Sequence, residues 1–273
     1  MACLACLFAS LASGTIGSFV VVKRIVFIAG SISHSILAGM GLCLWLQRTQ
    51  GISWIDPIGG AFAAAIASAL LIGWIHLHYR QREDAVIAAI WSTGMAIGVI
   101  FLSLTPGNNV EMMNFLFGNI LWIQPRDLLL LGALDALLLL IVAFKYRRFL
   151  ALCFDPEQAI LQGVAAHRLY LLLLSIVAIT IVLLVQIIGT ILVLALLTIP
   201  ATLAGLFTRR LFSMMIVATL LSILFSFFGI AASYTLDWPP GATIALLSAL
   251  CYLVGLLAKK KKFRLNLPSS IGD

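Results

Sequence analysis

The sequence has 273 residues, of which 63% are hydrophobic and 10% are charged, with a mean hydropathy of +1.15 and a formal net charge of +7. In soluble domains about a quarter of the residues are charged. The composition of this chain therefore excludes a soluble globular protein and indicates a membrane protein. The positive charge does not indicate nucleic-acid binding. Five basic residues, Lys259 to Lys262 and Arg264, directly follow an apolar stretch, where they would bind anionic lipid.

Apolar runs long enough to cross a bilayer follow one another along the chain. In lipid such a run must be helical or belong to a closed barrel, and runs of about twenty residues without strict alternation favour helices. We therefore predict an all-α fold, a polytopic transmembrane helical bundle with about 8–9 spans. The predicted spans are 2–22, 26–46, 55–77, 85–104, 128–144, 169–187, 189–207, 211–232 and 241–258.

The stretch 169–208 decides the number of spans, because it contains forty residues without a charge. A straight helix of that length would measure about 60 Å, which is enough for two crossings of a hydrocarbon core of about 30 Å. Gly189 and Pro200 interrupt the run, and both residues weaken a helix. The second half, 189–207, is then either a full span or a broken, re-entrant helix.

The distribution of Lys and Arg predicts which side each loop faces, since cytoplasmic loops carry an excess of these residues. With nine spans and an outer N-terminus, 15 of the 17 Lys and Arg residues fall on the inner side, and Arg48 and Arg126 fall on the outer side. We expect a multi-pass protein of the inner or plasma membrane, with a single transmembrane domain at 1–258 and a basic cytoplasmic tail at 259–273.

Two short segments do not span. Residues 112–126 are apolar but too short to cross, which favours a re-entrant or interfacial helix on the outer side. Residues 154–168 lie between two spans on the predicted cytoplasmic side. Asp155 suits an N-cap, Pro156 the first helical position and Glu157 the first turn. This segment is either an ordinary structured loop or a short helix that docks a cytoplasmic partner.

Ionisable residues inside a span are costly and are usually functional. His34 lies near the middle of the second span, next to Ser31, Ser33 and Ser35, whose hydroxyls could bridge helices or contact a hydrated ion. His34 is either a functional residue or a packed structural histidine. Asp135 lies in the fifth span, either as a neutral interior group or as part of a pathway.

Two carboxylates, Glu111 and Asp237, flank the predicted outer entrance and could attract a cation, or could be solvated loop charges. The sequence has no G-x-x-x-x-G-K-[ST], no G-x-G-x-x-G and no H-E-x-x-H motif. Any dependence on ATP must therefore come from a partner. We also expect that the chain is not an enzyme, because no nucleophile and base, and no three metal ligands, fall at one depth.

Several segments, in order, resemble the permease subunits of zinc, manganese and iron ABC importers, the family that includes ZnuB. The similar segments are GSFVVVKRIVFI (17–28), SISHSILAG (31–39), REDAVIAAIWSTGMAIGVIFLSLTPG (82–107), NFLFGNIL (114–121), FDPEQAILQGV (154–164), QIIGTILVLALLTIPATLAGLFTRR (186–210) and YTLDWPPGATIALLSA (234–249). Together they extend through nearly the whole chain.

The resemblance implies a permease that pairs with a second permease copy or a paralogue, two cytoplasmic ATPase subunits and an extracytoplasmic metal-binding lipoprotein. It implies no permanently bound cofactor, only a transported divalent metal ion. His34 matches the intramembrane histidine that contacts the ion, and Asn119 matches a polar position of the LFG-[DN] block. The segment 154–168 matches the part that docks into the ATPase. Its matched residues are Asp155, Pro156, Glu157, Gly163 and Arg168.

One position departs from the family. Many members have an acidic residue four positions before the histidine, where this chain has Gly30. An Asp and a His at i and i+4 share a helix face and form half of a metal site, so this half-site is missing here. Two alternatives to a metal importer are an ion-coupled secondary transporter with Asp135 or His34 as a proton relay, and a siderophore or cobalamin permease, which would have about one more span.

Overall fold

The computed structural model describes residues 1–265 apart from 53, 80–82, 107–114, 116–117 and 119–122, with residues 83 and 258–265 described by their backbone alone. In this part of the chain all regular structure is helical, which confirms the predicted all-α fold. The helices are α1 (Ala2–Val22), α2 (Val26–Thr49), α3 (Pro57–His78), α4 (Glu83–Leu104), α6 (Pro125–Phe154), α7 (Pro156–Leu161), α8 (Ala166–Ile188), α9 (Thr190–Phe207), α10 (Leu211–Leu236) and α11 (Pro240–Leu265).

Among the described residues, nine helices are long and apolar enough to cross a membrane, and all but α7 are of this kind. The predicted multi-pass bundle is therefore confirmed. The largest difference from the predicted boundaries is α6, which has 30 residues where the sequence predicts 128–144. It begins earlier because Pro125 takes the first turn and because Asp127 accepts a hydrogen bond from the backbone N–H of Gln124 at 3.0 Å. It ends later because a helix can continue beyond the lipid into water.

The long uncharged stretch forms two separate helices. Gly189 divides α8 from α9 with φ of +79° and ψ of 159°, a conformation that residues with a side chain rarely adopt. Pro200 lies inside α9 and does not end it. The second half of the stretch is therefore one helix from Thr190 to Phe207, as two crossings require.

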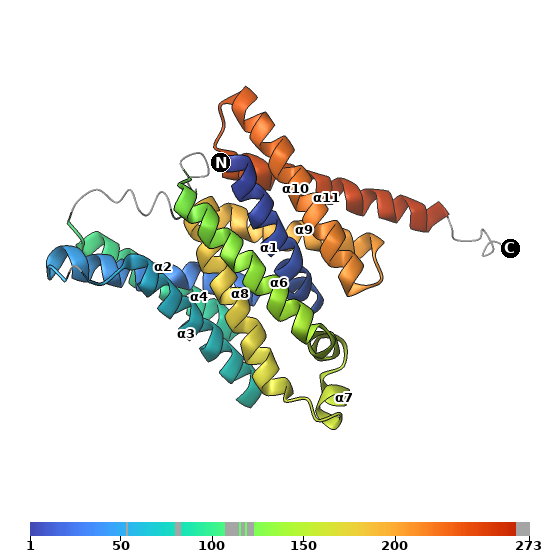
Figure 1. Cartoon of the computed structure of the whole chain (residues 1–273), viewed down its shortest axis with the longest axis horizontal. Helices are drawn as coiled ribbons and strands as arrows, with labels where there is room; N and C mark the ends of the chain where they lie inside the picture. The colour runs from blue at the N-terminus through green and yellow to red at the C-terminus, as the bar shows by residue number, and fades with distance from the viewer. Residues whose placement is uncertain (53, 80–82, 107–114, 116–117, 119–122, 266–273) are drawn as a thin grey trace.

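Two groups of helices lie on either side of α8 (Figure 1). In the first group, α2 packs against both α3 and α4. In the second, α1 packs against α9 and α10, and α11 packs against the same two helices. Helix α8 contacts α2 and α3 of the first group and α9 of the second, while α6 packs against α1 and α8. Helix α8 thus joins the two groups.

Helices α2 and α4 approach very closely. A Cβ atom added to Gly94 would lie 2.8 Å from the Cα atom of Ser35, and one added to Gly98 would lie 2.7 Å from the backbone of Leu37. Both distances are too short for a side chain. The G-x-x-x-G pattern of α4 therefore permits this contact, as small residues do between membrane helices, and it fixes which face of α4 meets His34.

Candidate functional site

His34 faces α4 and stacks on an aromatic ring. Its imidazole lies 4.6 Å from the ring of Trp91 between centroids, and the two planes differ by 13°. Both side chains are half-buried. An imidazole held flat against an indole has a restricted plane, so its ring nitrogens point along a defined direction rather than turning freely.

Trp91 also lies over Gly30. A Cβ atom added to Gly30 would be 3.4 Å from Cζ3 and 3.8 Å from Cη2 of the indole, which is ordinary van der Waals contact. Gly30 and His34 are one helical turn apart on the same face of α2. The indole therefore covers the face that an acidic residue would share with the histidine. Sequence reasoning did not single out Trp91, although it lies on the same face of α4 as Gly94.

The serines around His34 have different surroundings. The hydroxyl of Ser31 donates to the carbonyl oxygen of Ile87 on α4 at 3.1 Å, so this serine does bridge two helices. The hydroxyl of Ser35 donates to its own helix at the carbonyl oxygen of Ile32, at 2.9 Å. Ser33 is fully buried, and its hydroxyl has no hydrogen-bond partner among the described residues. One of the three hydroxyls thus stabilises the contact that holds His34 against α4.

Of the two predicted outer carboxylates, Asp237 is the one within the described residues. Glu111 and the matched Asn119 lie outside the described residues. Asp237 is exposed at the end of α10 with φ of +54°, in a turn where the hydroxyl of Ser233 donates to the carbonyl oxygen of Trp238 at 2.6 Å. The structure therefore places Asp237 in a tight turn, on a helix that does not belong to the group packed around α2.

Phe115, four residues before Asn119 in the sequence, is buried and lines a cavity of about 230 Å³ between α2, α3 and α8. The walls include Ile36 and Met40, which follow His34 along α2, and Gln186 of α8. The cavity is mostly apolar, and the side-chain amide of Gln186 is a polar group in its wall. Because Ile36 and Met40 lie two and six residues after His34 on a helix, the cavity is on the side of α2 opposite to His34. Its α8 wall reaches Gln186, in the last turn before Gly189.

The described residues contain no group of three or more His, Cys, Asp or Glu side chains that could hold a metal ion. Structural zinc sites have four protein ligands, and catalytic zinc sites have three. Asp135 is only 3% exposed, and neither of its carboxylate oxygens has a hydrogen-bond partner in the described part of the chain. The described helices thus contain separate ionisable groups rather than a closed metal cage.

The predicted docking segment is shorter than expected. The sequence predicts a helix over about 154–168, but α7 ends at Leu161, while Phe154 belongs to α6 and Arg168 to α8. The reason is Gly163, whose φ of +79° ends the helix. Its N–H donates to the carbonyl oxygen of Ile160 at 2.9 Å, and the next N–H donates to the carbonyl oxygen of Ala159 at 3.0 Å, a Schellman cap.

The start of α7 agrees with the prediction. The Oδ1 atom of Asp155 accepts a hydrogen bond from the N–H of Gln158 at 2.9 Å, Pro156 begins the helix and Glu157 lies in its first turn. Leu161 is 87% exposed. The structure therefore gathers Asp155, Pro156, Glu157 and Gly163 in one capped turn of helix, and it places Arg168 in the first turn of α8.

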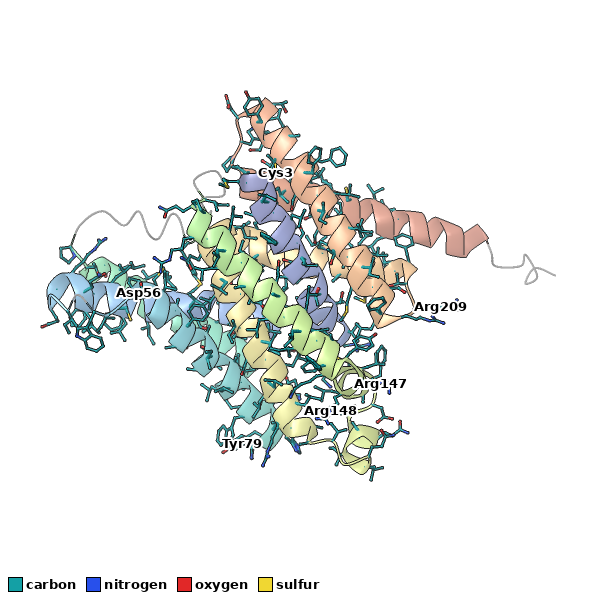
Figure 2. All side chains as sticks on the ribbon, in the orientation of Figure 1. Cys3, Asp56, Tyr79, Arg147, Arg148 and Arg209 are labelled. Carbon is teal, nitrogen blue, oxygen red and sulfur yellow. The ribbon has the colours of Figure 1, made fainter. Side chains whose placement is uncertain are left out.

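Basic residues gather at the same end of the bundle as α7. Arg147, Arg209 and Arg210 line one cavity together with Asp155. The Nζ atom of Lys23 donates to the carbonyl oxygen of Leu152 at 2.9 Å. Figure 2 shows Arg147 beside α7 and Arg209 at the turn between α9 and α10, with Cys3 at the opposite end of the bundle. Basic residues from helix α6 and from the turns after α1 and α9 are thus found at one end of the bundle.

Comparisons with known proteins agree with this architecture. Residues 1–259 match the model of a family described as the ABC 3 transport family. A "Probable metal transport system membrane protein" of Chlamydia pneumoniae is 51% identical over 258 residues, which cover 94% of this chain and 88% of that protein. The "Manganese import system permease protein ScaB" of Streptococcus parasanguinis is 30% identical and covers 92% of this chain and 86% of its own length.

A solved structure is also similar. The structure titled "PsaBC from Streptococcus pneumoniae in complex with Fab" contains a chain that superposes with a TM-score of 0.81 at 25% identity, covering 93% of this chain and 89% of that one. The family match and the identity over nearly the full length confirm the prediction of a multi-pass transport permease rather than an enzyme. This chain belongs to the ABC 3 transport family.

Proposed function

We propose that this chain is the membrane-spanning permease of an ABC importer that moves a divalent transition-metal cation, zinc, manganese or iron(II), into the cell, with His34 as a ligand during transit. The proposal is supported by the family and by relatives named for metal or manganese transport. The observation that carries it is the half-buried imidazole of His34, held by Trp91 inside the membrane-spanning helix α2.

The chemistry of this position suits passage rather than storage. Imidazole binds zinc, iron and related transition metals, and a pathway must bind an ion weakly enough to release it. The described helices offer no closed cage that would trap the ion. An inside-negative membrane adds about 2.3 kcal/mol per charge for each 100 mV, so inward movement of a divalent cation is electrically favoured. ATP then mainly drives the change in conformation.

The ATPase partner follows from the sequence and from α7. The sequence has no nucleotide-binding motif, so hydrolysis belongs to a separate subunit. Helix α7 presents Leu161 at 87% exposure and Ile160 at 48% on a polar segment, and exposed apolar side chains of this kind are typical of interaction sites. We propose that α7 docks into a dimeric cytoplasmic ATPase. A second permease copy or paralogue and an extracytoplasmic metal-binding lipoprotein complete the proposed complex.

The test is uptake of competing zinc, manganese and iron(II) isotopes by vesicles that contain the whole complex. We expect His34→Ala to leave assembly unchanged and to lower ATP-dependent uptake by about tenfold or more, since loss of a partner in a metal shell costs about 10–100-fold. His78→Ala is the matched control, because this histidine bonds to its own helix at the carbonyl oxygen of Trp74. Unchanged uptake by His34→Ala would remove His34 from the pathway.

The same vesicles test the alternative of an ion-coupled secondary transporter. The observation that favours this alternative is the buried carboxyl group of Asp135, which has no hydrogen-bond partner among the residues that the structure describes. Uptake that continues without ATP and is lost in Asp135→Asn would support it. The importer instead predicts strict dependence on ATP and an Asp135→Asn variant that still transports.

A further inference from the structure

Two cavities meet on one side of the bundle. The first is a groove of about 490 Å³ between α1, α6 and α10. Its walls are mostly aliphatic side chains within the spans, among them Leu139, Val142 and Ala143 of α6 and Met215, Ile216 and Leu220 of α10. From Leu139 to Tyr146 the groove follows α6 for about 10 Å at 1.5 Å per residue. This length is about two thirds of the thickness of one leaflet in a hydrocarbon core of about 30 Å.

The second cavity, of about 580 Å³, lies at the α7 end of the first. Tyr146 and Phe212 line both cavities, and their rings meet edge to face with centroids 6.4 Å apart. The two cavities are thus adjoining parts of one site. Beyond these rings the lining includes three arginines beside its apolar side chains.

Three exposed arginines, Arg147, Arg209 and Arg210, line this second cavity. The acidic side chain in the same lining is Asp155, and its Oδ1 already accepts a hydrogen bond from the N–H of Gln158. The cavity therefore carries an excess of positive charge. Guanidinium groups bind phosphate oxygens in pairs of parallel hydrogen bonds, which makes arginine well suited to phosphate recognition.

We propose that this site binds one anionic phospholipid, with its phosphate headgroup among Arg147, Arg209 and Arg210 and an acyl chain in the groove between α6 and α10. The order of the two cavities matches the molecule: an apolar tail within the span and a negative headgroup at the basic end. A soluble protein partner could contact the arginines but could not fill a groove inside the hydrocarbon. The inference does not depend on which ion is transported.

The site also joins parts of the fold that are otherwise far apart in sequence. The headgroup cavity is bounded by the end of α6, by α7 and by the turn between α9 and α10. Figure 2 shows Arg147 and Arg209 at this end of the bundle, on different elements. A bound headgroup would therefore bridge α6 and α10 beside the turn of helix that begins at Asp155.

The test is native mass spectrometry of the full-length protein in detergent, titrated with phosphatidylglycerol or with phosphatidylcholine. Each basic residue beside an anionic headgroup contributes about fivefold in affinity. We expect phosphatidylglycerol to bind more tightly than phosphatidylcholine, and Arg209→Gln with Arg210→Gln to weaken it on the order of 25-fold. Arg148→Gln is the matched control, since Arg148 is exposed on α6 but does not line the cavity.

A second pair of variants tests the groove. Ala143→Phe fills the apolar cavity and should weaken binding of phosphatidylglycerol, whereas Leu140→Phe should not, because Leu140 is 55% exposed and lies outside the lining. The comparison of the two lipids uses the unaltered protein, so it does not depend on whether a variant folds. Equal binding of phosphatidylglycerol and phosphatidylcholine would overturn the proposal. Release of phosphatidylglycerol when the ATPase is added would also overturn it, because the arginines would then belong to the ATPase interface.

Discussion

Replacing Gly94 by Ala should force α2 and α4 apart at the candidate site. The new Cβ atom would lie 2.8 Å from Cα and 2.9 Å from Cβ of Ser35, whereas carbon atoms pack at about 3.5–4.0 Å. The helices must therefore separate by about 1 Å, next to the stack of His34 on Trp91. Overpacking of this kind costs about 1–3 kcal/mol, while Gly to Ala in a helix gains up to about 1 kcal/mol.

Gly59→Ala is the matched control, because Gly59 is also helical and a Cβ atom there would meet nothing within 4 Å. Both variants gain the same helix propensity from alanine. The difference between their free energies of unfolding therefore measures the clash with Ser35, which we expect to cost about 1–3 kcal/mol. We expect thermal unfolding of Gly94→Ala in detergent to begin several degrees below that of Gly59→Ala, at about 2–4 °C per kcal/mol. Equal midpoints for the two variants would refute the close crossing of α2 and α4.

Trp91→Ala should leave His34 free to rotate and should raise the metal concentration needed for half-maximal uptake, since a stacked pair contributes about 0.5–1.5 kcal/mol. The control is Trp45→Ala, which removes a tilted ring contact between the same helices and should leave that metal concentration unchanged. Gly30→Asp should fold, because its Cβ atom fits against the indole. Calorimetry should show that the Gly30→Asp variant binds metal more tightly, and its rate of metal uptake should be lower. Faster uptake by this variant would contradict the prediction. Asp155→Ala should lose a helix cap of about 1 kcal/mol and the coupling of ATP turnover to transport, which Asp155→Asn should retain.

The positions of the spans could be predicted from the sequence because the thickness of the hydrocarbon core fixes the length of each apolar run. The end of α6 could not, since a helix that leaves the lipid continues for as long as its backbone remains bonded and its residues tolerate it. Gly163 gave a signal that the sequence prediction did not use: a glycine after a capped turn is a common helix end.

The candidate site could be predicted only in part. His34 could be identified because an ionisable residue inside a span is energetically costly and is usually functional. Trp91 did not, because an aromatic residue in an apolar helix is ordinary and helical periodicity does not indicate which helix it will face. The presence of Arg147, Arg209 and Arg210 in one cavity likewise depends on how α6 and α10 both pack against α1, which no local sequence pattern contains.

The unbroken length of α6 has a mechanical consequence. Its 30 residues run from the capped start at Pro125 to Phe154, directly before α7. At 1.5 Å per residue this rod is about 45 Å long, so a tilt of about 5° at one end displaces the other by roughly 4 Å. A displacement of Phe154, which lies next to the bend at Asp155 before α7, would therefore reach Pro125 at the far end of α6 without crossing a break in the helix.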